Sequence, residues 1–112
     1  MGILHYGTER AELDDRALAH VQLLIVSKLR KQEAFLLSWT VEPQHGSGRI
    51  SVWVDAGVPI GFRFDGSRAP AINRAWLEHM VEQSFTVTGT EVTSEAEFEA
   101  YAAASRATKD TA

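Results

Sequence analysis

The sequence predicts an α+β domain: an antiparallel sheet of about four to five strands, two main helices packed on one face, and a short C-terminal helix. Two observations support this fold class. Several short segments alternate apolar and polar residues, which is typical of strands with one buried face. Two longer segments repeat apolar residues at intervals of three and four, which is typical of helices that lie on a sheet.

The chain begins with two short strand-like runs. Gly2–Tyr6 is the first, Gly7–Thr8 forms a turn, and Arg10–Leu13 returns as the second strand of a hairpin. By the two-residue period of a strand, Ala11 and Leu13 face inward.

The clearest helix runs from about Asp15 to Arg30. Asp14 and Asp15 suit its start, because carboxylates accept hydrogen bonds from the first free N–H groups and complement the positive end of the helix dipole. Lys28, Arg30 and Lys31 suit the other end, where cations complement the negative end of the dipole. Its apolar stripe consists of Leu18, Val21, Leu24, Ile25 and Leu29.

Three strands are predicted in succession after this helix: Ala34–Val41, Arg49–Asp55 and Ile60–Phe64. The first two are separated by a loop at Pro43–Gly48, and the last two by a short connection at Ala56–Pro59. Because short connections usually join neighbouring antiparallel strands, the three strands are expected to form a meander.

A second helix is expected after the turn at Asp65–Gly66, with Ser67 as its N-cap, Pro70 in its first turn and an end near Gln83. Its inward stripe is predicted to contain Ile72, Trp76 and Met80.

Phe85–Val92 has a strand-like composition but is interrupted by Gly89, so a strand and an extended connector are both open. The capping-box spacing of Ser94–Glu97 then predicts a short third helix to about Arg106. Residues 1–106 are therefore expected to form a single domain, with residues 107–112 as a frayed tail.

The length and composition of the chain exclude several classes of site and function. The chain has 112 residues, which fits one domain, and no cysteine, which excludes disulfides, thiolate zinc sites and cysteine nucleophiles. A net charge of −4 weighs against tight non-specific nucleic-acid binding. No apolar stretch approaches the roughly 18 residues of a membrane span, so a soluble cytoplasmic protein without a membrane partner is expected.

The four histidines do not predict a metal site. His5, His20, His45 and His79 share no ligand spacing, and His20 lies one residue off the apolar stripe, where it is expected on the flank of the helix. No Gly-x-Ser-x-Gly nucleophile elbow or P-loop is present either.

One run resembles a catalytic signature. Arg63–Arg68 reads Arg-Phe-Asp-Gly-Ser-Arg. It is similar to the Lys-x-Asp-Gly-x-Arg pattern of nucleotidyltransferases such as ATP-dependent DNA ligases, whose lysine attacks the α-phosphate. Arg63 stands where that lysine belongs, and a guanidinium remains protonated and cannot act as that nucleophile. The sequence therefore predicts no catalytic residue, and a strand–turn–helix corner at Asp65–Gly66.

A wider resemblance extends from the N-terminus to about Met80. It is carried by Gly2–Gly7, Leu13–His20, Phe62–Arg68 and Asn73–Leu77. These segments resemble a family of short uncharacterised bacterial proteins that are often labelled ATP-dependent DNA ligase or ligase-like.

The predicted ligand or partner surface lies on the polar face of the meander. If the alternate apolar residues face the helices, then Arg49, Trp53 and Arg63 share the opposite face, where they could stack on a base, bind phosphate or contact a protein. Arg68 and Arg74, near the start of the second helix, could add to this surface. Alternatively, Trp53 is covered by the C-terminal segment or by a second subunit.

Two functions follow from these patterns. The first is a non-catalytic binding or protein-interaction module without a cofactor, which self-associates or binds a protein partner. The second is a degenerate, DNA-ligase-like nucleotidyltransferase fragment that binds nucleotide or nucleic acid around Arg63, Asp65 and Arg68, with ATP and magnesium as its ligands.

Overall fold

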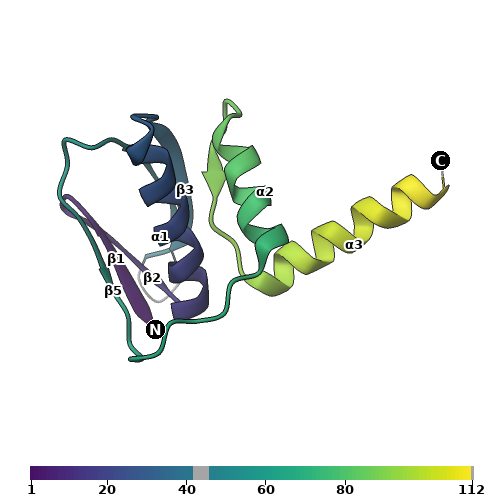
Figure 1. Cartoon of the computed structure of the whole chain (residues 1–112), viewed down its shortest axis with the longest axis horizontal. Coiled ribbons are helices and arrows are strands. Elements are labelled where there is room, and N and C mark those ends of the chain that lie inside the picture. Colours follow the sequence, from purple (N-terminus) through teal and green to yellow (C-terminus); the bar gives the residue numbers. More distant parts are fainter. Residues whose placement is uncertain (42–45, 112) are drawn as a thin grey trace.

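The computed structural model describes residues 1–41 and 46–111, and the fold is α+β (Figure 1). Within these residues, six strands form two three-stranded sheets, accompanied by three helices. The elements are, in chain order, β1 (Gly2–Tyr6), β2 (Glu9–Leu13), α1 (Asp15–Arg30), β3 (Phe35–Val41), β4 (Gly48–Val54), β5 (Ile60–Arg63), α2 (Arg74–Ser84), β6 (Thr90–Glu91) and α3 (Glu95–Thr111).

The first sheet, sheet A, has the strand order β2-β1-β5, and both neighbours of β1 are antiparallel to it. The predicted hairpin of β1 and β2 is confirmed, with the turn at Gly7 in the left-handed region (φ 59°) that glycine adopts without strain. Leu4 and Ala11 are paired on the inner face and are buried. Leu4 also pairs with Phe62 of β5, so the inner face of sheet A is apolar across all three strands.

The second sheet, sheet B, has the strand order β4-β3-β6. Strands β3 and β4 are antiparallel, with Leu37 opposite Val52. The predicted alternation is confirmed in β4, and the predicted inward residues Phe35, Leu37 and Trp39 of β3 are buried, as is Ser38 between them. The two-residue strand β6 runs parallel to β3. Gly89 precedes β6 with φ 72°, and its backbone passes close to Leu36 of β3.

Helix α1 occupies the predicted range and joins the two sheets through one hydrophobic core. Asp14 is the N-cap, and its carboxylate accepts the N–H of Ala17 at 2.6 Å. Side chains of the predicted stripe, including the fully buried Leu18 and Leu24, contribute to a core that both sheets share. Tyr6 links the sheets at one end, because its hydroxyl donates to the Trp53 carbonyl and accepts the N–H of Asp55.

The predicted meander is wrong. Strand β4 does pair with β3, but β5 leaves sheet B and pairs with β1. The connection over Ala56–Pro59 crosses from one sheet to the other, and Gly7 donates its N–H to the Pro59 carbonyl at 3.0 Å. Pairing with β5 satisfies the otherwise open edge of β1 and places the apolar face of β5 beside α1. The predicted single sheet is therefore replaced by two smaller ones.

Helix α2 begins later than predicted. Its N-cap is Asn73, whose side-chain oxygen accepts the N–H of Trp76 at 3.2 Å, and not Ser67. The residue before a proline avoids the helical region, so Ala69 and Pro70 belong to a non-helical connection. Ile72 lies in that connection and is 42% exposed, so its place on the inward stripe is wrong, whereas Trp76 and Met80 are buried as predicted.

Helix α3 starts at its predicted position, where the Ser94 hydroxyl accepts the N–H of Glu97 at 3.1 Å. It continues to Thr111, past the predicted end at Arg106. Figure 1 shows α3 projecting away from the rest of the molecule. With α3 included, the principal-axis extents are 46 × 33 × 31 Å. Among the described residues, no helix has the length and apolar character needed to cross a membrane.

Candidate functional site

The Asp65–Gly66 corner, which carries the ligase-like pattern, is held by a carboxylate from α1. Asp15 accepts the backbone N–H of Asp65 at 3.0 Å and that of Gly66 at 2.7 Å. These two hydrogen bonds hold the pKa of Asp15 below its usual value of 3.8. The carboxylate thus occupies the backbone N–H groups of both residues at this corner. Asp65 itself is exposed, and its side chain lies 3.4 Å from the N-terminal amine.

The structure separates the residues of the predicted polar face. Arg49 and Trp53 lie on the outer face of β4 in sheet B, and Trp53 is 61% exposed. Arg63 is exposed on β5, opposite Ile3 of β1, and therefore belongs to sheet A. The expectation of one shared face is wrong because it rested on β5 pairing with β4. Neither the C-terminal segment nor another described segment buries Trp53.

The remaining predicted residues follow β5. Asp65 and Arg68 lie in the connection between β5 and α2, and so stay near Arg63 along the chain. Arg68 is six residues before α2 instead of at its start, and Arg74 is the exposed first residue of that helix. Arg63, Asp65 and Arg68 thus belong to the sheet A side of the molecule, apart from the sheet B residues.

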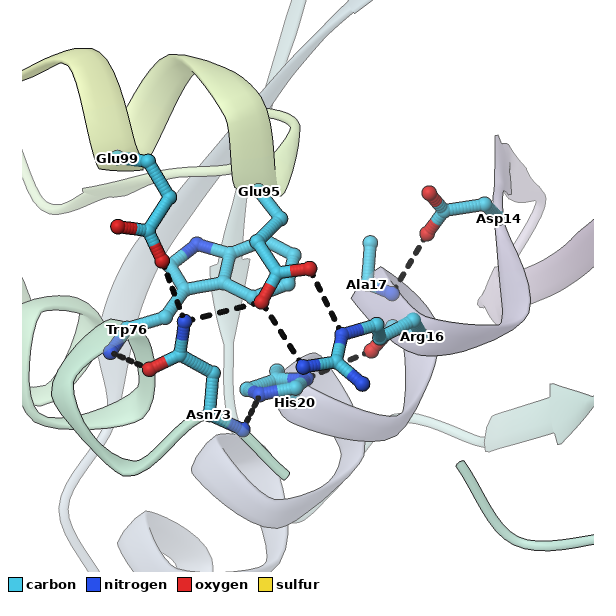
Figure 2. Close-up of polar contacts among 8 residues, drawn as sticks. All are labelled: Asp14, Arg16, Ala17, His20, Asn73, Trp76, Glu95 and Glu99. Atoms are coloured by element: carbon cyan, nitrogen blue, oxygen red, sulfur yellow. Dashed lines mark hydrogen bonds and ion pairs between the residues drawn. The ribbon is translucent and has the colours of Figure 1, made fainter. Parts of the chain in front are cut away.

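A polar cluster joins the three helices, and sequence reasoning did not predict it (Figure 2). The Arg16 guanidinium on α1 makes two hydrogen bonds to the Glu95 carboxylate of α3, at 2.8 and 2.9 Å. The Asn73 side-chain amide donates to Glu95 at 2.9 Å and to Glu99 at 3.0 Å. The bonds from Arg16 and Asn73 lower the pKa of Glu95, and the carboxylate in turn raises the pKa of Arg16.

His20 forms the buried base of this cluster and is 0% exposed, so the predicted position on the helix flank is wrong. Its Nε2 is 2.9 Å from the backbone N–H of Asn73, which can only donate, so Nε2 must accept. Its Nδ1 is 2.7 Å from the Arg16 carbonyl, which can only accept, so Nδ1 carries the hydrogen. The ring also packs against Trp76, with centroids 4.4 Å apart.

The polar groups of this cluster are engaged with one another and with the backbone, so the cluster has a structural role. Both nitrogens of His20 are engaged by backbone groups, which leaves neither free to move a proton to or from a ligand. Glu95 is similarly occupied by Arg16 and Asn73. In the described part of the chain, no three His, Asp or Glu side chains gather in a way that could hold a metal ion.

The outer flank of α1 borders an apolar groove that runs beside β5. One hollow of about 330 Å³ lies between Val26 and Leu29 on α1 and Ile60 and Phe62 on β5. A second, separate hollow of about 370 Å³ is lined by Ala19, Gln22 and Leu23 of the same helix. The connection to α2 supplies the other wall of the second hollow, through Phe64, Gly66, Ser67, Arg68, Ala69, Pro70 and Ile72.

Strand β5 forms an edge of sheet A. Among the described residues, no strand pairs with the side of its backbone that points away from β1. Gly7 donates to Pro59, and hydrogen-bonded pairs recur at every second residue of an antiparallel ladder. Gly61 therefore bonds to β1, while the backbone N–H and C=O groups of Ile60 and Phe62 point outward. Figure 1 shows β5 at the outer left of the molecule, on the side opposite α2.

A pattern of apolar residues on α1 could have indicated this groove from the sequence. Ala19, Leu23 and Val26 form a second apolar row on α1, spaced four and three residues apart and distinct from the core stripe. A helix that covers a sheet with one stripe needs no second row. That row therefore marks an additional apolar surface, although only the placement of β5 shows what lies beside it.

Comparison with known proteins identified a family model that matches this chain, but no individual curated protein or solved structure. Residues 1–95 match a family model described as a domain of unknown function (DUF7882). The match includes both sheets and ends at the first residue of α3. Because the family match covers most of the chain, this protein belongs to the family of the domain of unknown function DUF7882.

Proposed function

We propose that the chain is a non-catalytic protein-interaction module that accepts an extended segment of a partner protein along the open edge of β5. The observation that carries this proposal is the combination of an unpaired strand edge with an apolar groove beside it. Strand addition uses both features, because main-chain hydrogen bonds provide affinity and a neighbouring groove accepts alternate side chains.

The geometry suits this mode of binding. A segment added beyond β5 meets the outward N–H and C=O groups of Ile60 and Phe62. Its inward side chains enter the hollow lined by Val26 and Leu29. Exposed edges are normally blocked by proline, charge or a covering element. On β5, only Arg63 supplies such protection.

Titration with a model strand tests the proposal. An eight-residue peptide that alternates valine and threonine, added at millimolar concentration, should shift the amide NMR signals of Ile60, Phe62 and Val26. The variant Val26→Lys places a charged chain in the groove and should abolish these shifts. The matched control Ser27→Lys adds the same charge one residue away, outside the groove lining, and should retain them. Shifts that are absent, or that survive Val26→Lys, would refute the proposal.

Self-association through sheet B is a second candidate, favoured by the exposed Trp53 on the outer face of β4. Tryptophan is enriched at interfaces because it buries a large apolar area. Sedimentation velocity over a range of concentrations tests this candidate: Trp53→Ser should abolish a dimer, whereas Phe85→Ser, which removes another exposed aromatic residue, should not. A chain that stays monomeric at every concentration contradicts it.

A further inference from the structure

We infer that the segment accepted by β5 alternates apolar with acidic residues, so that glutamate or aspartate side chains lie on the outer face of sheet A and apolar side chains in the groove. This inference rests on the proposed function and adds the chemistry of the partner. It follows from the charges near the open edge of β5.

Three arginines lie near the open edge of β5. Arg30 lines the first hollow at the C-terminal end of α1 and Arg68 lines the second, whereas Arg63 is exposed on β5 on the opposite, outer face of sheet A. All three residues themselves are exposed, and none forms an ion pair within residues 1–41 and 46–111. The chain as a whole carries a net charge of −4, so this group of arginines departs from its average charge.

The carboxylates of this region are already occupied. Asp15 accepts the backbone N–H groups of Asp65 and Gly66. Asp65 lies 3.4 Å from the N-terminal amine, and Glu33 binds the buried Lys28 at 3.1 Å. Among the described residues, none of these carboxylates forms an ion pair with the three arginines, and an incoming acidic segment would supply such a partner to Arg63.

The pleat of the sheet decides where each type of side chain belongs. Phe62 points toward α1 and Arg63 toward the opposite face, because successive residues of a strand alternate. A partner residue beside Phe62 must therefore be apolar. The next partner residue lies beside Arg63 on the exposed face, where an opposite charge across the ladder is favourable.

The same arginines disfavour a second copy of this chain as the occupant. Antiparallel pairing of two β5 strands would place the Arg63 residues of the two copies toward opposite ends of the short ladder. Neither arginine would then face a side chain of opposite charge, whereas an acidic segment supplies one. A different protein segment of opposite charge is therefore the occupant that fits.

Three peptides of equal length test the charge preference. In the first, valine alternates with glutamate; in the second, with threonine; and in the third, with lysine. The glutamate peptide should bind about twofold to fivefold more tightly than the threonine peptide at low ionic strength, and the lysine peptide more weakly, since each exposed ion pair adds only a modest increment. Amide NMR titration provides both the dissociation constant and the location. The preference should diminish as salt is added.

Charge reversal provides the matched variants. Arg63→Glu should remove the preference for the glutamate peptide, whereas Arg49→Glu, on an exposed edge strand of the other sheet, should leave it unchanged. If all three peptides bind β5 equally, the acidic partner is refuted and the interaction module stands. If none of the peptides binds β5, the proposed function fails, and this inference fails with it.

Discussion

The backbone N–H of Asn73 donates a hydrogen bond to Nε2 of the buried His20 at 2.9 Å. This single bond joins the middle of α1 to the residue that caps α2. The Asn73 side chain extends the connection to Glu95 and Glu99 at the start of α3. The orientation of all three helices therefore depends on one polar cluster next to the core.

Removing the His20 ring should destabilise the fold strongly. His20→Ala leaves the Asn73 N–H without its acceptor and creates a cavity beside Trp76. A loss of about 3 kcal/mol in the free energy of unfolding is expected from these two effects. Urea denaturation measures it, with His5→Ala on the exposed face of β1 as the control, which should change little. A His20→Ala protein as stable as the control would contradict the structural role of the cluster.

Stability should fall in acid because of Asp15 and Glu95. Both carboxyl groups have a folded-state pKa below the ordinary value, Asp15 through the N–H groups of Asp65 and Gly66 and Glu95 chiefly through Arg16. A depressed pKa contributes stability that is present above the unfolded-state pKa, near 4, and is lost as pH falls through the lower folded-state pKa. Urea midpoints between pH 6 and pH 2.5 measure this loss.

The variants Asp15→Asn and Glu95→Gln should each make that decline in stability shallower, because each removes one of the linked protons. Glu78→Gln, which neutralises an exposed carboxylate on α2, should leave the slope close to that of the unmodified chain. If the stability of Asp15→Asn falls with pH as steeply as that of Glu78→Gln, the hydrogen bonds from Asp65 and Gly66 do not lower the pKa of Asp15.

Gly89 should not tolerate a side chain. A Cβ at this position would overlap the Leu36 carbonyl oxygen and lie 2.7 Å from the Leu36 Cβ, and its φ of 72° disfavours other residues. Gly89→Ala should therefore cost about 2–4 kcal/mol. Gly57→Ala is the control, since a Cβ there would meet no atom within 4 Å and the φ of Gly57 is not positive. Thermal unfolding of both variants separates this local clash from a general effect of removing glycine.

ATP with magnesium should not stabilise the protein. The guanidinium of Arg63 cannot replace the ligase lysine, and Asp15 already binds the backbone donors of the corner. A ligand at a hundred times its dissociation constant adds about 2.7 kcal/mol, which would raise the melting temperature of a domain of this size by several degrees. We expect no such rise at millimolar ATP. A rise that disappears in Arg68→Ala would instead support the ligase-like nucleotide-binding function.

Local patterns were sufficient for most individual elements. The acidic residues at Asp14 and Asp15 and the basic residues of the last turn predicted the two ends of α1, and two-residue alternation identified the buried faces of β3 and β4. The capping box at Ser94 predicted the start of α3. These features depend on interactions within a few residues, which are visible along the sequence.

The arrangement of these elements was decided only by tertiary contacts. The pattern of Ile60 and Phe62 fits any strand with one apolar face, and the free edge of β1 determined which sheet β5 joins. Ser67 had the chemistry of a cap, but the contact between Asn73 and His20, 53 residues apart, accompanies the actual start of α2. Sequence alone therefore determined where most of the helices and strands form, whereas long-range hydrogen bonds and apolar burial selected their partners, and with them the groove beside β5.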